Sequence, residues 1–167
     1  YTSKLFKLPI VISRFSNIYG PGQLNFTALI PDAITSCINK KLFKMRGNGE
    51  AIRDFVHIDD IVDVYKLLSE KLYMLPAKYS GEIFNAGTNS PKKIKDVVKQ
   101  IYLFKKKFKE YKSIVKNIKK NRTQGEISVQ FMDYKKLYKY FKWKPKKNFE
   151  KSLPSLFKWY ENYLKNN

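Results

Sequence analysis

Residues 9–22 read PIVISRFSNIYGPG, and this stretch decides the fold class. The β-branched run Ile10–Phe15 follows a proline break and predicts a buried strand. Directly after it, Gly20-Pro21-Gly22 predicts a turn or loop. A second strand is predicted over residues 82–86, ending at Gly87. Since helical patterns separate the two strands, the sequence indicates an α/β or α+β domain.

Helical apolar spacing fills most of the chain around these strands. It runs over residues 26–37, 59–72, 90–101, 105–120, 133–141 and 154–164, and further short strands are predicted at 42–46 and 127–132. We expect Asp59 and Asp133 to cap helices, and Ser90 with Pro91 to begin one. Pro154 is expected in or before the first turn of the last helix, or else to bend it.

Positive charge is concentrated in the second half of the chain. The net charge is +20, and residues 92–167 carry 23 basic and 6 acidic side chains, against 11 and 8 in residues 1–91. Such a surface predicts weak, salt-sensitive attraction to polyanions, but no nucleic-acid-binding motif accompanies it. Almost all the cations are lysines; the arginines are Arg14, Arg46, Arg53 and Arg122. Because a guanidinium suits bidentate phosphate recognition, we expect the few arginines to mark functional positions.

The cysteine count and the hydropathy narrow the class of protein further. Cys37 is the only cysteine, so an internal disulfide is excluded, and its apolar surroundings predict a buried, reduced thiol compatible with a cytoplasmic location. No apolar run reaches the length of a membrane-spanning helix. No cluster of metal-ligating residues is evident either, so a metal site is not expected.

Motifs in a fixed order resemble those of one enzyme family. RFSNIYGPG at 14–22 resembles the R-x-x-N-x-Y-G-P segment of extended short-chain dehydrogenases that act on nucleotide sugars. Residues 46–60, RGNGEAIRDFVHIDD, are similar to their G-x-x-x-R-D-[FY]-V-x-[IV]-x-D signature, and EIFNAG at 82–87 is similar to a later F-N-x-G strand. The tail, with Gln130, Trp143 and Pro145, resembles that of CDP-glucose 4,6-dehydratases in the NAD-dependent epimerase/dehydratase family. Phe141-Lys142 departs from the L-G expected before the tryptophan.

The resemblance implies a fold, a ligand set and site residues. Residues 1–167 would form a single C-terminal substrate-binding region of an extended short-chain dehydrogenase, with 10–22 as the last part of a Rossmann sheet that is mostly missing. The implied cofactor is NAD, the implied substrate CDP-glucose, and the full-length enzyme a homo-oligomer. Phe15 and Ser16 are expected beside the cofactor. Substrate contacts are implied at Asn17, Asn25, Phe26, Arg53, Arg122 and Gln130.

Alternatives remain open for several of these assignments. Arg53 either binds the diphosphate or pairs with Asp54 or Asp60, and Asn17 either binds substrate or ties down the Gly20 loop. Arg46 precedes a glycine turn and faces either nucleotide or solvent. Rival functions are an epimerase or dehydratase acting on GDP-mannose, dTDP-glucose or UDP-sugars, and a basic anion- or nucleic-acid-binding module.

Catalytic residues of the implied reaction are not expected in this sequence. Its seven glycines form no G-x-G-x-x-G. Tyr1 and Lys4 stand three positions apart, one fewer than in the family's Y-x-x-x-K pair. His57, the only histidine, lacks a catalytic constellation, and Asp59-Asp60 is better explained by a helix start. We therefore expect a fragment that binds substrate without turning it over.

Overall fold

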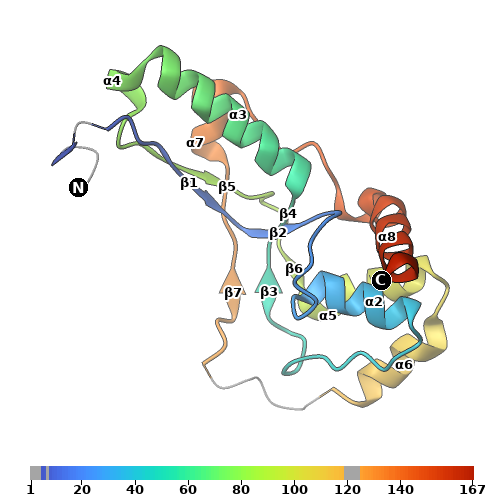
Figure 1. Ribbon diagram of the computed structural model, residues 1–167. Helices are drawn as coiled ribbons and strands as arrows, with labels where there is room; N and C mark the ends of the chain where they lie inside the picture. Colours follow the sequence, from blue (N-terminus) through green and yellow to red (C-terminus); the bar gives the residue numbers. More distant parts are fainter. Residues whose placement is uncertain (1–4, 7, 119–124) are drawn as a thin grey trace.

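The structure, a computed structural model, describes residues 5–6, 8–118 and 125–167. Its first layer pairs β1 (Ile12–Phe15) with β5 (Ile83–Ala86) in parallel, so that Ile12 lies opposite Ile83. Helices α3 (Ile58–Met74) and α7 (Lys135–Phe141) lie against this pair (Figure 1). A core forms between them, with Phe84 and Leu137 fully buried. The two strands predicted from the sequence are thus confirmed, and they are neighbours.

Two further small sheets continue from this layer. β2 (Asn17–Tyr19) pairs in parallel with β4 (Phe55–His57). β3 (Ile52–Arg53) lies between β6 (Lys92–Lys93), antiparallel, and β7 (Val129–Gln130), parallel. The residues around Arg53 therefore meet three segments that are far apart in the sequence.

The larger core is helical. It joins α2 (Leu29–Ile38), α5 (Ile94–Phe104) and α8 (Phe149–Asn166), with α6 (Phe108–Lys116) beside α5 (Figure 1). Cys37 is buried in this core, as predicted, and burial raises the pKa of its thiol. The short α4 (Pro76–Tyr79) follows α3. These elements confirm an α/β fold.

One edge of β1 stays open in the part of the chain that the structure describes. There β1 pairs with β5 alone, and Ile12 is 44% exposed. Ile18, on the following strand, is exposed as well. An apolar strand edge of this kind normally receives another strand, which agrees with a sheet that is only partly present in this sequence.

The strand predicted at Leu42–Arg46 is wrong. Burial does alternate there, with Phe43 and Met45 in the core and Leu42 and Lys44 exposed. The segment nevertheless runs without strand pairing, because no described backbone lies beside it as a ladder partner. Alternating burial of side chains indicates an extended chain with one buried face. Such a chain is a β-strand only if its backbone is hydrogen-bonded to a neighbouring strand.

Several helix starts also differ from the predictions. His57, not Asp59, caps α3: its Nδ1 accepts from the Asp59 N–H at 3.1 Å. α5 begins at Ile94 because residues 92–93 form β6, so Ser90 and Pro91 lie before the helix. Asp133 accepts from the Lys135 N–H at 3.2 Å, one position ahead of the N-cap of α7. In α8 the cap is an asparagine at 148, and Pro154 lies inside the helix.

Several surface lysines of the basic half pair with carboxylates. Pairs that join segments distant in the sequence include Lys92–Glu150, Lys105–Glu161, Lys136–Glu82 and Lys146–Asp63, each at 2.8 Å or less, and Lys95–Glu50. Such exposed pairs contribute little stability each, about 0–1 kcal/mol. In these pairs the lysines connect segments on the surface of the fold. Among the described residues, no helix has the length and apolarity needed to cross a membrane.

The His57 cap should make stability depend on pH. Burial lowers the pKa of His57 below its ordinary 6.5, and the cap needs an unprotonated Nδ1. The unfolded chain therefore binds the proton more readily, so the free energy of unfolding should fall as pH drops below 6.5, by at most about 1.4 kcal/mol per pH unit. Urea unfolding followed by circular dichroism between pH 7.5 and roughly 5.5 measures this dependence. His57→Asn keeps a cap acceptor that does not titrate and should flatten it; an unchanged slope would contradict the assignment.

Candidate functional site

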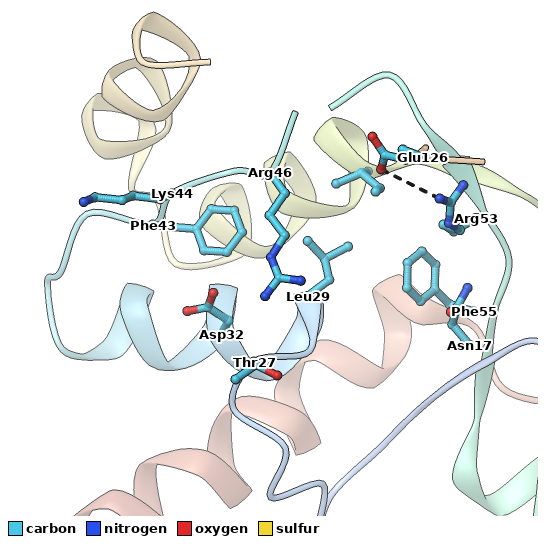
Figure 2. Close-up of a pocket in the computed structure, with 11 residues that line it drawn as sticks. Asn17, Thr27, Leu29, Asp32, Phe43, Lys44, Arg46, Arg53, Phe55 and Glu126 are labelled. Atoms are coloured by element: carbon cyan, nitrogen blue, oxygen red, sulfur yellow. Dashed lines mark ion pairs between the residues drawn. The ribbon is translucent and has the colours of Figure 1, made fainter. Parts of the chain in front are cut away.

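A cavity of about 230 Å³ lies where α2, the segment before β3 and the start of β4 meet. Its charged lining carries three cations, Lys44, Arg46 and Arg53, and two carboxylates, Asp32 and Glu126. The rest of its lining is made of Asn17, Thr27, Leu29, Phe43, Phe55 and Ile94. Figure 2 shows Arg53 and Asn17 on one side of the cavity, and Arg46, Asp32 and Phe43 on the other. Tertiary folding therefore gathers two of the four arginines at one site.

Arg53 is held in place by two contacts. Its Nη1 donates to the carbonyl of Ile52 at 2.9 Å, and its Nη2 lies 3.7 Å from Glu126 Oε1 (Figure 2). The sequence left open an ion pair of Arg53 with Asp54 or Asp60, but Arg53 pairs with Glu126 instead. Both side chains of the Arg53–Glu126 pair are about 15% exposed. At that length the ion pair is weak enough to leave the guanidinium able to bind an anion in the cavity.

Arg46 is different, because it has no fixed partner. Its side chain extends into the cavity between Phe43 and Leu29, and Asp32 faces the same space (Figure 2). No hydrogen bond or ion pair joins Arg46 to another residue in the described part of the chain. Arg46 is exposed and also lines the cavity, so contact with a nucleotide stays a prediction.

Asn17 lies next to Arg53 because of backbone pairing. Its N–H and its Nδ2 both donate to the carbonyl of Asp54, each at 3.0 Å, so it does not tie down the glycine loop. Asp54 itself is fully buried and accepts from the Thr88 N–H at 2.8 Å and from the Thr88 hydroxyl. Space there is tight, since a Cβ at Gly87 would lie 2.4 Å from Asp54 Oδ2. This network holds the strand that carries Asn17 against the segment that follows Arg53.

Other residues predicted to contact substrate lie elsewhere. Asn25 is exposed and accepts from the Thr27 N–H and hydroxyl at 3.1 and 2.7 Å, which fixes the turn before α2. Phe26 packs against Tyr160 and Tyr163, with ring centroids 6.3 and 5.7 Å away. Neither lines the cavity, so their substrate contacts stay predictions.

Two further predictions concern the strand beside Arg53 and the tail. Gln130 pairs with Arg53 across the β3–β7 ladder, but its exposed side chain is not part of the lining. Arg122 lies outside the described residues. Sequence reasoning missed Asp32 and Glu126, although a carboxylate four residues after the arginine at 122 was visible within the tail motif.

The residues expected beside the cofactor occupy the carboxyl end of β1. The Ser16 N–H donates to Ala86 at 3.3 Å, and its buried hydroxyl has no hydrogen-bond partner among the described residues. Asn85 Oδ1, on the neighbouring strand, is likewise unpaired. Phe15 instead packs against Tyr65, with ring centroids 5.2 Å apart. Ligands of open α/β sheets bind beyond the carboxyl ends of strands, which is where these orphaned polar atoms lie.

Candidate acid–base groups show no activation. Burial raises the pKa of both Tyr19 and Tyr160 to about 12, the wrong direction for a proton-abstracting tyrosine. His57 is committed to its cap, and its ring meets that of Tyr19 edge-on at 5.1 Å. Asp60 is buried and accepts from the N–H groups of Lys146 and Lys147 at 2.9 and 3.1 Å. Among the described residues there is also no group of three or more metal-ligating side chains.

Comparison with known proteins identifies the family of this chain. The sequence matches the family model described as GDP-mannose 4,6 dehydratase over residues 2–156. The chain belongs to the GDP-mannose 4,6-dehydratase family. Two curated relatives are a dTDP-D-glucose 4,6-dehydratase of Dictyostelium discoideum, 36% identical over 98 residues, and a dTDP-glucose 4,6-dehydratase of Haemophilus influenzae, 28% identical over 165 residues. These matches cover 59% and 94% of this chain, and 21% and 46% of the relatives.

A solved member of this family has the same fold. The dTDP-glucose 4,6-dehydratase of Bacillus anthracis, determined in complex with NAD, is 29% identical, with a TM-score of 0.77. The match covers 98% of this chain and 48% of that enzyme. This chain therefore spans less than half of the length of these relatives, and its fold is that of one portion of a nucleotide-sugar 4,6-dehydratase.

Proposed function

We propose that this chain forms the nucleotide-diphosphate-binding part of a CDP-glucose 4,6-dehydratase. The observation that carries the proposal is the cavity into which Asn17, Arg46 and Arg53 converge from three segments. A nucleotide sugar presents a diphosphate, which needs fixed cations and amide donors. Membership in the 4,6-dehydratase family supports the reaction class. The tail around Gln130 and Trp143, which resembles that of CDP-glucose enzymes, supports the nucleotide.

The proposed whole-protein reaction converts CDP-glucose to CDP-4-dehydro-6-deoxyglucose. NAD, when bound, would take up the hydride from C4 of the sugar and return it at C6. Ser16 is the residue of this chain best placed to hold it, because its buried hydroxyl needs a partner at the sheet edge where dinucleotides bind. Arg53 would bind the diphosphate and Asn17 would orient it, so that the sugar is presented toward that edge.

Turnover is proposed to need residues that this sequence does not contain. No glycine-rich dinucleotide motif can be drawn from its 167 residues, and Tyr1 and Lys4, which precede Arg14, are one position short of the Y-x-x-x-K spacing. A tyrosine–lysine pair would abstract the proton at the start of the reaction. The chain should therefore bind CDP-glucose and leave it unchanged.

Isothermal titration of the 167-residue chain with CDP-glucose, CDP and glucose 1-phosphate tests the binding role. We expect CDP-glucose and CDP to bind, and glucose 1-phosphate, which lacks the nucleoside and one phosphate, to bind far more weakly. Mass spectrometry of CDP-glucose incubated with chain and NAD should show no loss of water. Failure of every nucleoside diphosphate to bind would overturn the proposal.

A further inference from the structure

We infer that Arg46 and Asp32 together recognise the base of the nucleotide, and that they select cytosine over uracil and thymine. The inference rests on the proposed nucleotide-binding role of the cavity and adds the chemistry by which the base is chosen. It is drawn from two side chains of opposite charge that line one cavity without contacting each other.

Arg46 has donors to spare. Arg53 uses its guanidinium on the Ile52 carbonyl and on Glu126, whereas Arg46 makes no hydrogen bond or ion pair with any residue in the described ranges. Its backbone is nevertheless fixed. Met45 is buried on one side, and Gly47 turns the chain with a φ of 61° on the other. A guanidinium on an anchored segment offers a planar pair of N–H donors to the cavity.

Asp32 supplies the complementary acceptor. It is half-buried in the first turn of α2, and its Oδ1 accepts from the Ser36 hydroxyl at 3.2 Å. Its other oxygen has no partner among the residues that the structure describes. Figure 2 shows the carboxylate directed to the same space as the Arg46 guanidinium. The cavity therefore presents donors and an acceptor side by side.

Cytosine matches this arrangement, and uracil reverses it. Along its pairing edge cytosine carries an amine at N4, which a carboxylate accepts from, next to acceptors at N3 and O2. Uracil and thymine place an oxygen at the N4 position and an N–H at N3. In the orientation that suits cytosine, their oxygen would face Asp32 and their N–H would face Arg46, so both groups would lose their partners. A site built to hydrogen-bond one pattern rejects the other strongly, because its own polar groups are left unpaired.

Apolar side chains complete the surroundings that a base needs. Leu29, Phe43 and Ile94 line the cavity beside the two charged groups. Flat apolar walls bind the faces of any base, and therefore add affinity without choosing among bases. The choice is left to Arg46 and Asp32.

Titration of the 167-residue chain with CDP, UDP, dTDP and GDP tests the inference. We expect CDP to bind about 10-fold or more tightly than UDP or dTDP. Arg46→Gln and Asp32→Asn should each bring the CDP and UDP affinities together. Arg14→Gln makes the same chemical change on β1, away from the cavity, and should leave the ratio unaltered. Arg53→Gln should weaken CDP and UDP alike and keep their ratio, because it acts on the diphosphate.

The possible results separate the base assignment from the function. Equal binding of CDP and UDP by the unmodified chain, or a CDP preference that survives Arg46→Gln, would overturn the inference while leaving nucleotide binding in place. Tighter binding of GDP than of CDP would overturn the choice of cytosine. If no nucleoside diphosphate binds, the proposed function itself fails. Since Arg46 is exposed, circular dichroism should confirm that its variant is folded.

Discussion

Replacing Arg53 with glutamine is expected to weaken CDP binding by about 10- to 100-fold. A hydrogen bond to a charged group contributes roughly 1.5–3 kcal/mol, and each 1.4 kcal/mol is about a factor of ten in affinity. Arg53 is only 15% exposed and is already oriented by the Ile52 carbonyl and Glu126. The Arg53 side chain therefore loses little conformational freedom when a diphosphate binds. Most of the free energy of its hydrogen bonds to the diphosphate should then appear in the measured affinity.

Isothermal titration at fixed salt is the appropriate measurement, because phosphate contacts depend on ionic strength. Arg53→Lys keeps the positive charge but not the planar pair of N–H donors. Its affinity for CDP should lie between that of the unmodified chain and that of Arg53→Gln. Arg14→Gln removes the same charge from an exposed position on β1 and should bind CDP as the unmodified chain does. Unchanged affinity in Arg53→Gln would remove Arg53 from the site.

Replacing Asp54 with alanine is expected to reduce the free energy of unfolding by about 3 kcal/mol. Asp54 is fully buried, and its carboxylate accepts from both the N–H and the hydroxyl of Thr88. Alanine would leave these partly buried donors without their partner, at up to about 1–3 kcal/mol each, and would open a cavity beside Gly87. Asp54 directly precedes β4 and Thr88 lies two residues after β5, so the loss would act on the contact between the segments that carry these strands.

Urea unfolding followed by circular dichroism measures this loss. Asp54→Asn keeps one acceptor and should cost less than alanine, which gives a second value if the alanine variant does not fold. Asp63→Ala makes the same chemical change at a surface pair with Lys146 and should cost under about 1 kcal/mol. Equal costs for Asp54→Ala and Asp63→Ala would show that the buried network contributes no more than a surface pair.

The net charge of this chain says little about its binding site until lysines and arginines are considered separately. The net charge of +20 by itself suggests a polyanion-binding module. In the structure many lysines form surface ion pairs, whereas Arg46 and Arg53 line the cavity. Arg14, on β1, does not line it, so two of the three arginines that the structure describes lie at the candidate site, and their role in function stays a prediction.

Local sequence was sufficient where the signal is local. The strands at β1 and β5 and the apolar faces of α3 and α5 follow from side-chain periodicity, which depends on the next few residues alone. The family motifs around Asn17 and Arg53 could be recognised from the sequence because each is a contiguous stretch of residues. The alternation of strand and helix patterns predicted the α/β class, and the order of the motifs indicated the family to which this chain belongs.

Tertiary structure decided whatever depends on a distant partner. Residues 42–46 alternate like a strand, yet no described segment pairs with them; Asp59 resembles a cap, yet His57 accepts its N–H. Glu126 reaches Arg53, and Asp32 shares a cavity with Arg46, only because the chain folds back on itself. Hydrogen bonding and ion pairing act through space, so the sequence determined which residues were candidates for the site, and the fold determined which of them meet.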